Sequence, residues 1–298
     1  MINAKRTAPA ELIVHKRRAK KFYTKLNEVK ESSKTRPNVM GIVFDYMQNL
    51  PLPSLPVQEM FFLRKLWYYV FNVYDFKNDR AVFYTYPEGV ANKGPDEVTS
   101  FVLDFLQNEI PAEITELHIF SDACGGQNRN HTMLLREQYE KYDRIYSPDQ
   151  YKAIIENSKK IQPTYKVKEV KNEDVLACKK WWPLYFVKLP KSLEDKRISF
   201  AISKYSYLIH RSDRKGYVVA SSFIGGFLSH TFKLTKSNDV VLPSSKAYDY
   251  GKVPIKVSKI NDVMKLIKYI PEEYLPFYDE RRTWPTTEAE TSDENDEN

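Results

Sequence analysis

Cysteine and long apolar runs are scarce in this sequence. Its 298 residues include two cysteines, Cys124 and Cys178, too few for the disulfide framework of a small secreted protein or for a zinc finger. No stretch approaches the about eighteen apolar residues of a membrane-spanning helix, and the N-terminus lacks the apolar region of a secretion signal. We therefore expect a protein of a reducing, intracellular compartment that does not enter a membrane.

Positive and negative charges are unevenly spread along the chain. Lys and Arg number 46 and Asp and Glu 39, which gives a net charge of +7. Residues 1–36 hold eleven basic and three acidic residues, whereas residues 286–298 hold six acidic residues and no basic one. The 42% of apolar residues is enough for a real core, which excludes a disordered or fibrous chain. This charge pattern suits a protein that works near polyanions.

The first half of the chain alternates apolar strand patterns with helical ones, which predicts an α/β fold. A basic amphipathic helix is expected over residues 11–30, with Ala19, Phe22, Tyr23 and Leu26 on one face. A second amphipathic helix is expected over residues 95–108, where Pro95 and two acidic residues favour a helix start. The expected strands are 39–45, 81–86 and 117–120, with a helix or strand over 61–74 and helical segments within 134–160 that break at Ser147-Pro148.

From about residue 161 the pattern changes to short β-branched and aromatic runs, which predicts a β-rich second module. The expected strands there are 165–170, 181–189, 198–202, 207–210, 217–224, 230–234 and 240–242, followed by a short helix within 259–278. The expected organisation is a basic helix (1–36), an α/β core (37–160), a β-rich C-terminal module (161–285) and a disordered acidic tail (286–298).

Two aspartates are candidates for metal chemistry. Asp45 and Asp122 each follow an apolar strand pattern, so neighbouring strands would present both carboxylates at one edge of the sheet. Carboxylates held in this way can bind a pair of Mg²⁺ or Mn²⁺ ions about 3.5–4 Å apart, which activate water against a phosphodiester. The alternative is that an Asp at a strand end only bonds the backbone of the following turn.

Several motifs resemble a known family. The segments FDYMQNLPLP (44–53) and FSDACGGQNRNHTM (120–133) look like those of a domain of unknown function found in transposon-derived animal proteins, itself similar to the RNase H-like core of DDE transposases. The resemblance extends to the segments 15–26, 86–98, 143–151 and 253–278, and so covers nearly the whole chain. It implies an RNase H-like mixed sheet flanked by helices, with Asp45 and Asp122 as inherited catalytic and metal-ligand positions.

The chain departs from the family after Met133. A further helix, a strand and an Asp-rich motif are expected there, yet Asp143 follows within ten residues. The missing stretch would carry the third carboxylate, so we expect weak or absent catalysis. Glu97 in the first helix is a substitute ligand, as are Glu137, Glu140 and Asp143, although each also suits an ordinary solvated helix face.

Basic and polar residues supply a second kind of chemistry, the binding of DNA or RNA. Residues 15–21 (HKRRAKK) can contact phosphates or act as a nuclear-localisation signal, although a basic helix is often only a solvated face. The turn at Gly125-Gly126, with Gln127 and Asn128 after it, can contact a phosphate, or it can simply be a tight turn. Lys179-Lys180-Trp181-Trp182 suits stacking on single-stranded nucleic acid, although paired tryptophans are often core residues. The candidate nucleic-acid-binding residues are Lys16, Arg17, Arg18, Lys20, Lys21, Gln127, Asn128 and Arg129.

Three functions compete at this point: an active metal nuclease, a nuclear nucleic-acid binder with weak or lost catalysis, and a non-catalytic protein-interaction module or decayed transposon remnant. The nucleic-acid binder fits the basic segments and the shortened core best. The shortening also predicts that an edge of the sheet, or the face of the helix over 95–108, is poorly covered.

Overall fold

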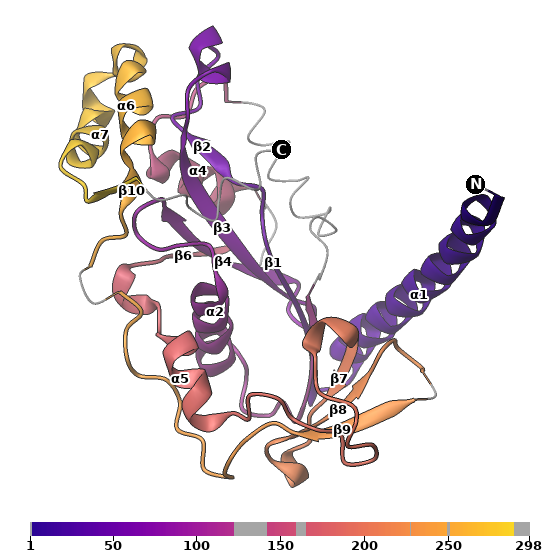
Figure 1. Cartoon of the computed structure of the whole chain (residues 1–298). Helices are drawn as coiled ribbons and strands as arrows, with labels where there is room; N and C mark the ends of the chain where they lie inside the picture. The colour runs from indigo at the N-terminus through magenta and orange to yellow at the C-terminus, as the bar shows by residue number, and fades with distance from the viewer. Residues whose placement is uncertain (1, 122–141, 159–164, 227, 249–250, 289–298) are drawn as a thin grey trace. The chain divides into compact units, whose positions relative to one another are not determined.

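The computed structural model describes residues 2–121, 142–158, 165–226, 228–248 and 251–288 (Figure 1). The chain divides into two compact units. Unit 1 comprises residues 1–39 and 179–243, and unit 2 comprises residues 40–178 and 244–298. The expected α/β class is confirmed, with a mixed sheet flanked by helices and a separate small β-sheet. The expected segment 161–285 is divided between the two units, because its ends belong to the unit of the main sheet.

The main sheet of unit 2 has six strands in the order β5-β1-β3-β4-β6, with β2 paired to β3. Neighbours β1, β3 and β4 are antiparallel, and β6 is parallel to β4. The strands β1 and β5 are therefore neighbours, which is the condition under which the sequence predicts a shared edge for Asp45 and Asp122. The strands are β1 (Val39–Tyr46), β2 (Leu50–Leu52), β3 (Leu66–Asp75), β4 (Arg80–Pro87), β5 (Glu116–Ser121) and β6 (Lys166–Glu169).

Helix α2 (Pro95–Asn108) covers one face of this sheet and confirms the expected helix over 95–108. Pro95 occupies its first turn with Asp96 and Glu97, where proline and negative charge are both favourable. Phe101 stacks on Tyr84 with ring centroids 5.0 Å apart and lies 5.5 Å from the ring of Phe71. These aromatic contacts form the centre of the larger core.

The opposite face contacts helix α4 (Pro148–Asn157). Ser147 and Gln150 form a capping box at its start, so the expected break at Ser147-Pro148 is the beginning of a helix. Tyr151 of α4 stacks on Tyr68 of β3 at 5.3 Å.

The C-terminal segment packs against the same sheet. Its α6 contacts β3, and a buried ion pair joins Lys259 of α6 to Glu88 at 3.0 Å. The elements of this segment are β10 (Ile255–Lys256), α6 (Val257–Lys265), η5 (Ile267–Tyr269), η6 (Glu272–Tyr274), α7 (Leu275–Arg282) and β11 (Thr286–Thr287). Two short 3₁₀ turns elsewhere in unit 2 are η1 (Gln58–Phe61) and η2 (Asn172–Asp174).

Unit 1 combines a long helix with a small antiparallel sheet in the order β7-β8-β9. Val218, Ala220 and Phe232 form its buried core, against which Phe200 and Tyr205 pack. Its elements are α1 (Ile2–Thr35), all but the first residue of α5 (Cys178–Tyr185), η3 (Ile202–Lys204), β7 (Tyr207–Ile209), η4 (Ser212–Arg214), β8 (Tyr217–Ser221) and β9 (Ser229–Lys233).

Four details of the sequence-based expectation for residues 161–285 were wrong. The run 181–189 begins in helix α5 rather than in a strand, because two tryptophans and a tyrosine pack as well on a helix as on a sheet. The runs 198–202 and 240–242 form no named strand. The run 165–170 gives β6, which joins the main sheet instead of the small one.

Candidate functional site

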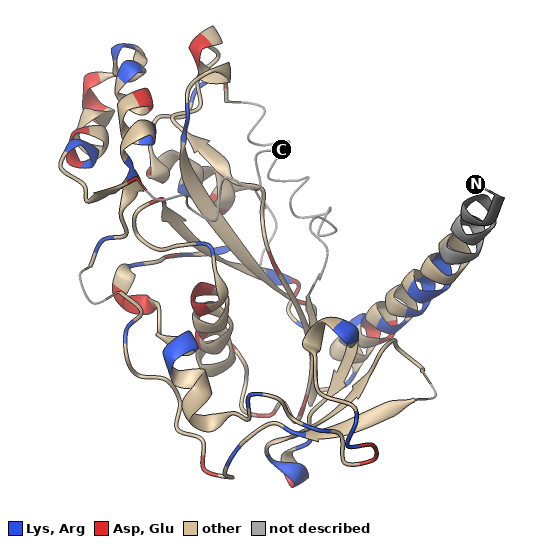
Figure 2. Cartoon of the chain, in the orientation of Figure 1, with Lys and Arg blue, Asp and Glu red and all other residues tan. Residues whose placement is uncertain are grey.

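The five candidate basic residues of α1 are all exposed. Figure 2 shows Lys and Arg recurring along this helix. The residues opposite them, Ala19, Phe22 and Leu26, are partly buried, and the same face continues into the buried Val29. The predicted amphipathic pattern is therefore confirmed for Ala19, Phe22 and Leu26, whereas Tyr23, expected on the same face, is 45% exposed. The five basic residues are Lys16, Arg17, Arg18, Lys20 and Lys21.

Two of these cations also connect α1 to the segment between β8 and β9 of unit 1. Arg18 and Lys21 lie over the ring of Phe223, 5.6 and 5.4 Å from its centroid. The Lys21 Nζ donates a hydrogen bond to the carbonyl of Gly225 at 3.4 Å. Because an aromatic face attracts cations, these contacts hold the basic helix beside a second basic segment that is distant in sequence.

The division into units separates the charges strongly. Unit 1 holds 23 Lys and Arg against 7 Asp and Glu, a net charge of +16. Unit 2 holds 23 Lys and Arg against 32 Asp and Glu, a net charge of −9. Half of the excess of positive charge in unit 1 comes from residues 1–39, with eleven basic and three acidic residues. The other half comes from residues 179–243, with twelve basic and four acidic residues. Unit 1 therefore carries a large excess of positive charge, and we call its exposed Lys and Arg side chains the cationic surface of unit 1. A surface of this kind attracts polyanions.

Several acids of unit 1 are held in local contacts. Asp195 pairs with Arg197 at 2.8 Å, and Asp213 pairs with Arg211 at 2.9 Å. Hydrogen bonds from Arg197 hold the pKa of Asp195 below its usual value. Burial opposes the ionisation of Glu194, but hydrogen bonds from Thr231 and Ser192 outweigh it and lower its pKa to about 2. These carboxylates stay charged at neutral pH and fix loops.

Asp45 lies near the end of β1, on the face of the main sheet opposite α2. Its neighbours Phe44 and Tyr46 pack against the α2 cluster, and side chains alternate along a strand, so Asp45 points to the other face. It is paired in register with Asn72 of β3, which is 4% exposed. The Asn72 Oδ1 has no hydrogen-bond partner among the described residues. A carboxylate beside an unpaired amide oxygen is a donor set that suits Mg²⁺ or Mn²⁺.

Glu97 belongs to α2 and so lies on the face of the sheet that this helix covers. Its described contacts are with Tyr248 and Asn92 and not with Asp45. Its carboxylate accepts hydrogen bonds from the Tyr248 hydroxyl and, at 3.2 Å, from the backbone N–H of Asn92. Burial raises the pKa of Glu97 above its usual value. Because Asp45 points to the opposite face, the described structure does not bring these two candidate metal ligands together.

The candidate site residues between 122 and 141, which include those next to Gly125-Gly126, lie outside the described residues. Asp122 directly follows Ser121, the last residue of β5. Of the substitute carboxylates, Asp143 is described and exposed. Within the described ranges, no group of three or more His, Cys, Asp and Glu side chains is placed to hold a metal ion. The candidates outside these ranges are Asp122, Gln127, Asn128, Arg129, Glu137 and Glu140.

Sequence reasoning missed two features. Asn72 gave no signal, because an asparagine within an apolar strand identifies neither its partner nor its face. The joining of residues 1–39 to residues 179–243 is decided by tertiary structure, although the excess of cations in 179–243 could have been counted.

None of the described helices is long and apolar enough to cross a membrane. Comparisons with protein-family models, curated protein sequences and solved structures gave no match to this chain.

Proposed function

We propose that this protein binds nucleic acid, DNA or RNA, through the cationic surface of unit 1, and that it acts in the nucleus. The observation that carries the proposal is the net charge of +16 in unit 1, compared with −9 in unit 2. A nucleic acid gains affinity from each phosphate that a Lys or Arg neutralises, because condensed counterions are released. The exposed cations of α1 supply such contacts along one continuous helix.

We further propose that unit 2 is an RNase H-like core of transposase descent. In support, β3 pairs antiparallel with both β1 and β4. Helix α2 follows β4 in the chain, and the next strand, β5, lies beside β1 in the sheet. Asp45 and Asn72 would hold Mg²⁺ or Mn²⁺ on one face, where such an ion polarises a phosphodiester. Glu97 does not fit this site, so we propose that metal-dependent cleavage is weak or lost.

The test of binding compares matched pairs of neutralised cations in the full chain. Arg17→Gln with Lys20→Gln removes two charges from α1, and Lys265→Gln with Lys268→Gln removes two exposed charges from unit 2. We expect the α1 pair to weaken binding of a fluorescent duplex several-fold and to reduce the slope of log affinity against log salt by about two. The unit 2 pair should leave both quantities unchanged.

Fluorescence anisotropy at salt concentrations of about 50 to 200 mM gives both quantities. Absence of binding at the lowest salt, or equal effects of the two pairs, would contradict the proposal.

The role of Asp45 is tested separately with Asp45→Asn. We expect this variant to retain the affinity of the unchanged protein for DNA, because the cationic surface lies in unit 1. Cleavage of labelled DNA with Mg²⁺ or Mn²⁺ added is the second measurement. Robust cleavage that disappears in Asp45→Asn would instead favour an active metal nuclease.

A second candidate is a protein-interaction module. Leu184, Ile202 and Leu228 of unit 1 are each more than two-thirds exposed, at 68%, 67% and 79%. Exposed apolar side chains of this size often mark a contact with another protein. Concentration-dependent self-association in analytical ultracentrifugation, without DNA binding, would support this candidate against the first.

A further inference from the structure

A tryptophan at the surface of unit 1 is positioned as a stacking platform. Trp182 of α5 stacks face to face on Phe186, with ring centroids 3.7 Å apart and an angle of 6° between the planes. The side chain of Trp182 is nevertheless 49% exposed. Because Phe186 covers one face of the indole, this exposure leaves its other face open to solvent.

The surroundings of Trp182 hold this ring in place. Trp181 meets it edge-on at 6.4 Å and donates a hydrogen bond from its own Nε1 to the Val241 carbonyl at 2.6 Å. The backbone N–H of Phe186 donates to the Trp182 carbonyl at 3.0 Å, and Val187 donates to Leu234 beyond β9 at 2.8 Å. The platform is therefore ordered before any ligand arrives, which lowers the entropic cost of stacking.

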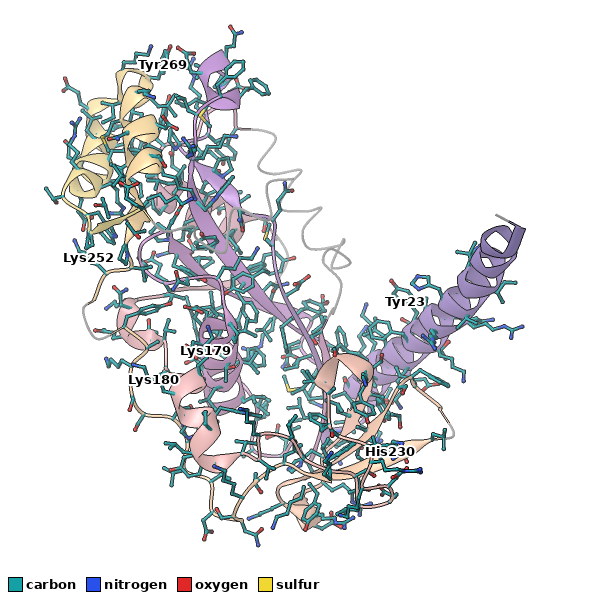
Figure 3. All side chains as sticks on the ribbon, viewed as in Figure 1. Tyr23, Lys179, Lys180, His230, Lys252 and Tyr269 are labelled. Atoms are coloured by element: carbon teal, nitrogen blue, oxygen red, sulfur yellow. The ribbon has the colours of Figure 1, made fainter. Side chains whose placement is uncertain are left out.

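Three exposed lysines lie close to Trp182 in the sequence. Lys179 lies one helical turn before Trp182, on the same side of α5, and Lys180 follows it; both are exposed (Figure 3). Lys188 is exposed just beyond the helix, and residues 179–193 contain no acidic residue. An exposed aromatic face in a segment with several lysines and no acidic residue suits a base and its phosphates better than the uncharged surface of an apolar protein partner.

We propose that Trp182 stacks on an unpaired base, so that unit 1 prefers single-stranded nucleic acid, or a duplex with unpaired ends, to a continuous duplex. This inference rests on the proposed binding of nucleic acid and specifies its substrate. In a continuous duplex every base face is already stacked on its neighbours, so only the phosphate contacts of the lysines remain there. Single-stranded binders obtain a large share of their affinity from base stacking on aromatic side chains.

The experiment compares substitutions at one aromatic position in each unit of the full chain. Trp182→Ala removes the platform, Trp182→Phe keeps a smaller aromatic ring, and Phe61→Ala removes an aromatic side chain of unit 2 that is 87% exposed. The probes are a fluorescent poly-thymidine strand of about 20 nucleotides and a duplex of the same length, titrated by anisotropy. Circular dichroism establishes that each variant is folded.

We expect Trp182→Ala to weaken binding of the single strand about tenfold, with little effect on the duplex. Trp182→Phe should recover much of the loss, and Phe61→Ala should change neither affinity. Equal losses for strand and duplex, or no loss for either, would overturn the stacking role while leaving the proposed function intact. If the unchanged protein binds neither probe, the proposed function fails as well.

Discussion

At the scale of single residues, the main candidate metal ligand Asp45 and the substitute ligand Glu97 have different environments. Asp45 lies beside the amide of Asn72 on one face of the sheet, whereas Glu97 is buried on the other with Tyr248 and Asn92. Burial raises the pKa of Glu97, so its neutral form is favoured relative to an exposed glutamate. Glu97 therefore behaves as a structural acceptor of hydrogen bonds.

The first prediction concerns the pH dependence of stability through Glu97. A raised pKa in the folded state means that folding takes up a proton, so stability falls as pH rises from 4.5 through that raised value. Glu97→Gln keeps an acceptor for Asn92 and carries no charge. We expect the variant to lose this pH dependence and to be at least as stable near neutral pH.

Urea unfolding at several pH values between 4.5 and neutrality measures this effect. A glutamine variant that is clearly less stable at neutral pH would mean that the ionised carboxylate has a cationic partner.

At the scale of elements, β5 is one of the two edge strands of the main sheet that the described residues cover sparsely, the other being β6. Strand β5 lies at one end of the strand order among the described residues, and five of its six residues are exposed or only partly buried. Ile119 is 46% exposed, while Phe120 is buried and lies 6.1 Å from the ring of Phe76. The shortened sequence after Met133 predicted poor cover of a sheet edge or of the helix at 95–108. The second alternative is wrong, because Phe101 and Phe105 of α2 are buried in the core. Residues 122–141, which follow β5, lie outside the described residues, so poor cover of the β5 edge stays a prediction.

The second prediction contrasts the neighbouring side chains of Ile119 and Phe120. Ile119→Lys should change the free energy of unfolding by less than about 1 kcal/mol, because its side chain is already partly in water. Phe120→Ala should cost about 3 kcal/mol, since it leaves a cavity beside Phe76. Urea denaturation of both variants measures the contrast. If the two losses are equal, another segment covers Ile119.

At the scale of the whole molecule, charge is distributed by unit. The 23 Lys and Arg of unit 1 repel one another and are opposed by only seven acids, whereas charges in unit 2 are closer to balance. Self-repulsion in a compact unit is a cost that salt screens, since the Debye length falls to about 10 Å at 0.1 M. Under the proposed function the same charges would attract nucleic acid, so unit 1 would give up some stability in exchange for binding.

The third prediction is that moderate salt stabilises unit 1 while it weakens binding to DNA. Hydrogen exchange resolved by segment is the suitable measurement, because it reports each unit separately. Protection of β8 and β9 should increase with added NaCl, and protection of β3 and β4 should change less. If protection of β8 and β9 falls with salt, ion pairs rather than repulsion dominate unit 1.

The sequence by itself determined the local elements and the kinds of chemistry available. Helix α2 follows from Pro95 and its apolar spacing, strands β1 and β5 follow from short apolar runs, and the basic character of α1 follows from composition. These features depend on neighbours within a few residues, where periodicity and capping are decisive.

Only the tertiary structure decided which distant segments meet. It joined α1 to residues 179–243, placed β6 in the main sheet and put Asp45 and Glu97 on opposite faces. It also made a helix of Trp181 and Trp182, with one ring anchored and the other open. These outcomes depend on packing between residues far apart in the chain, which local propensity does not encode.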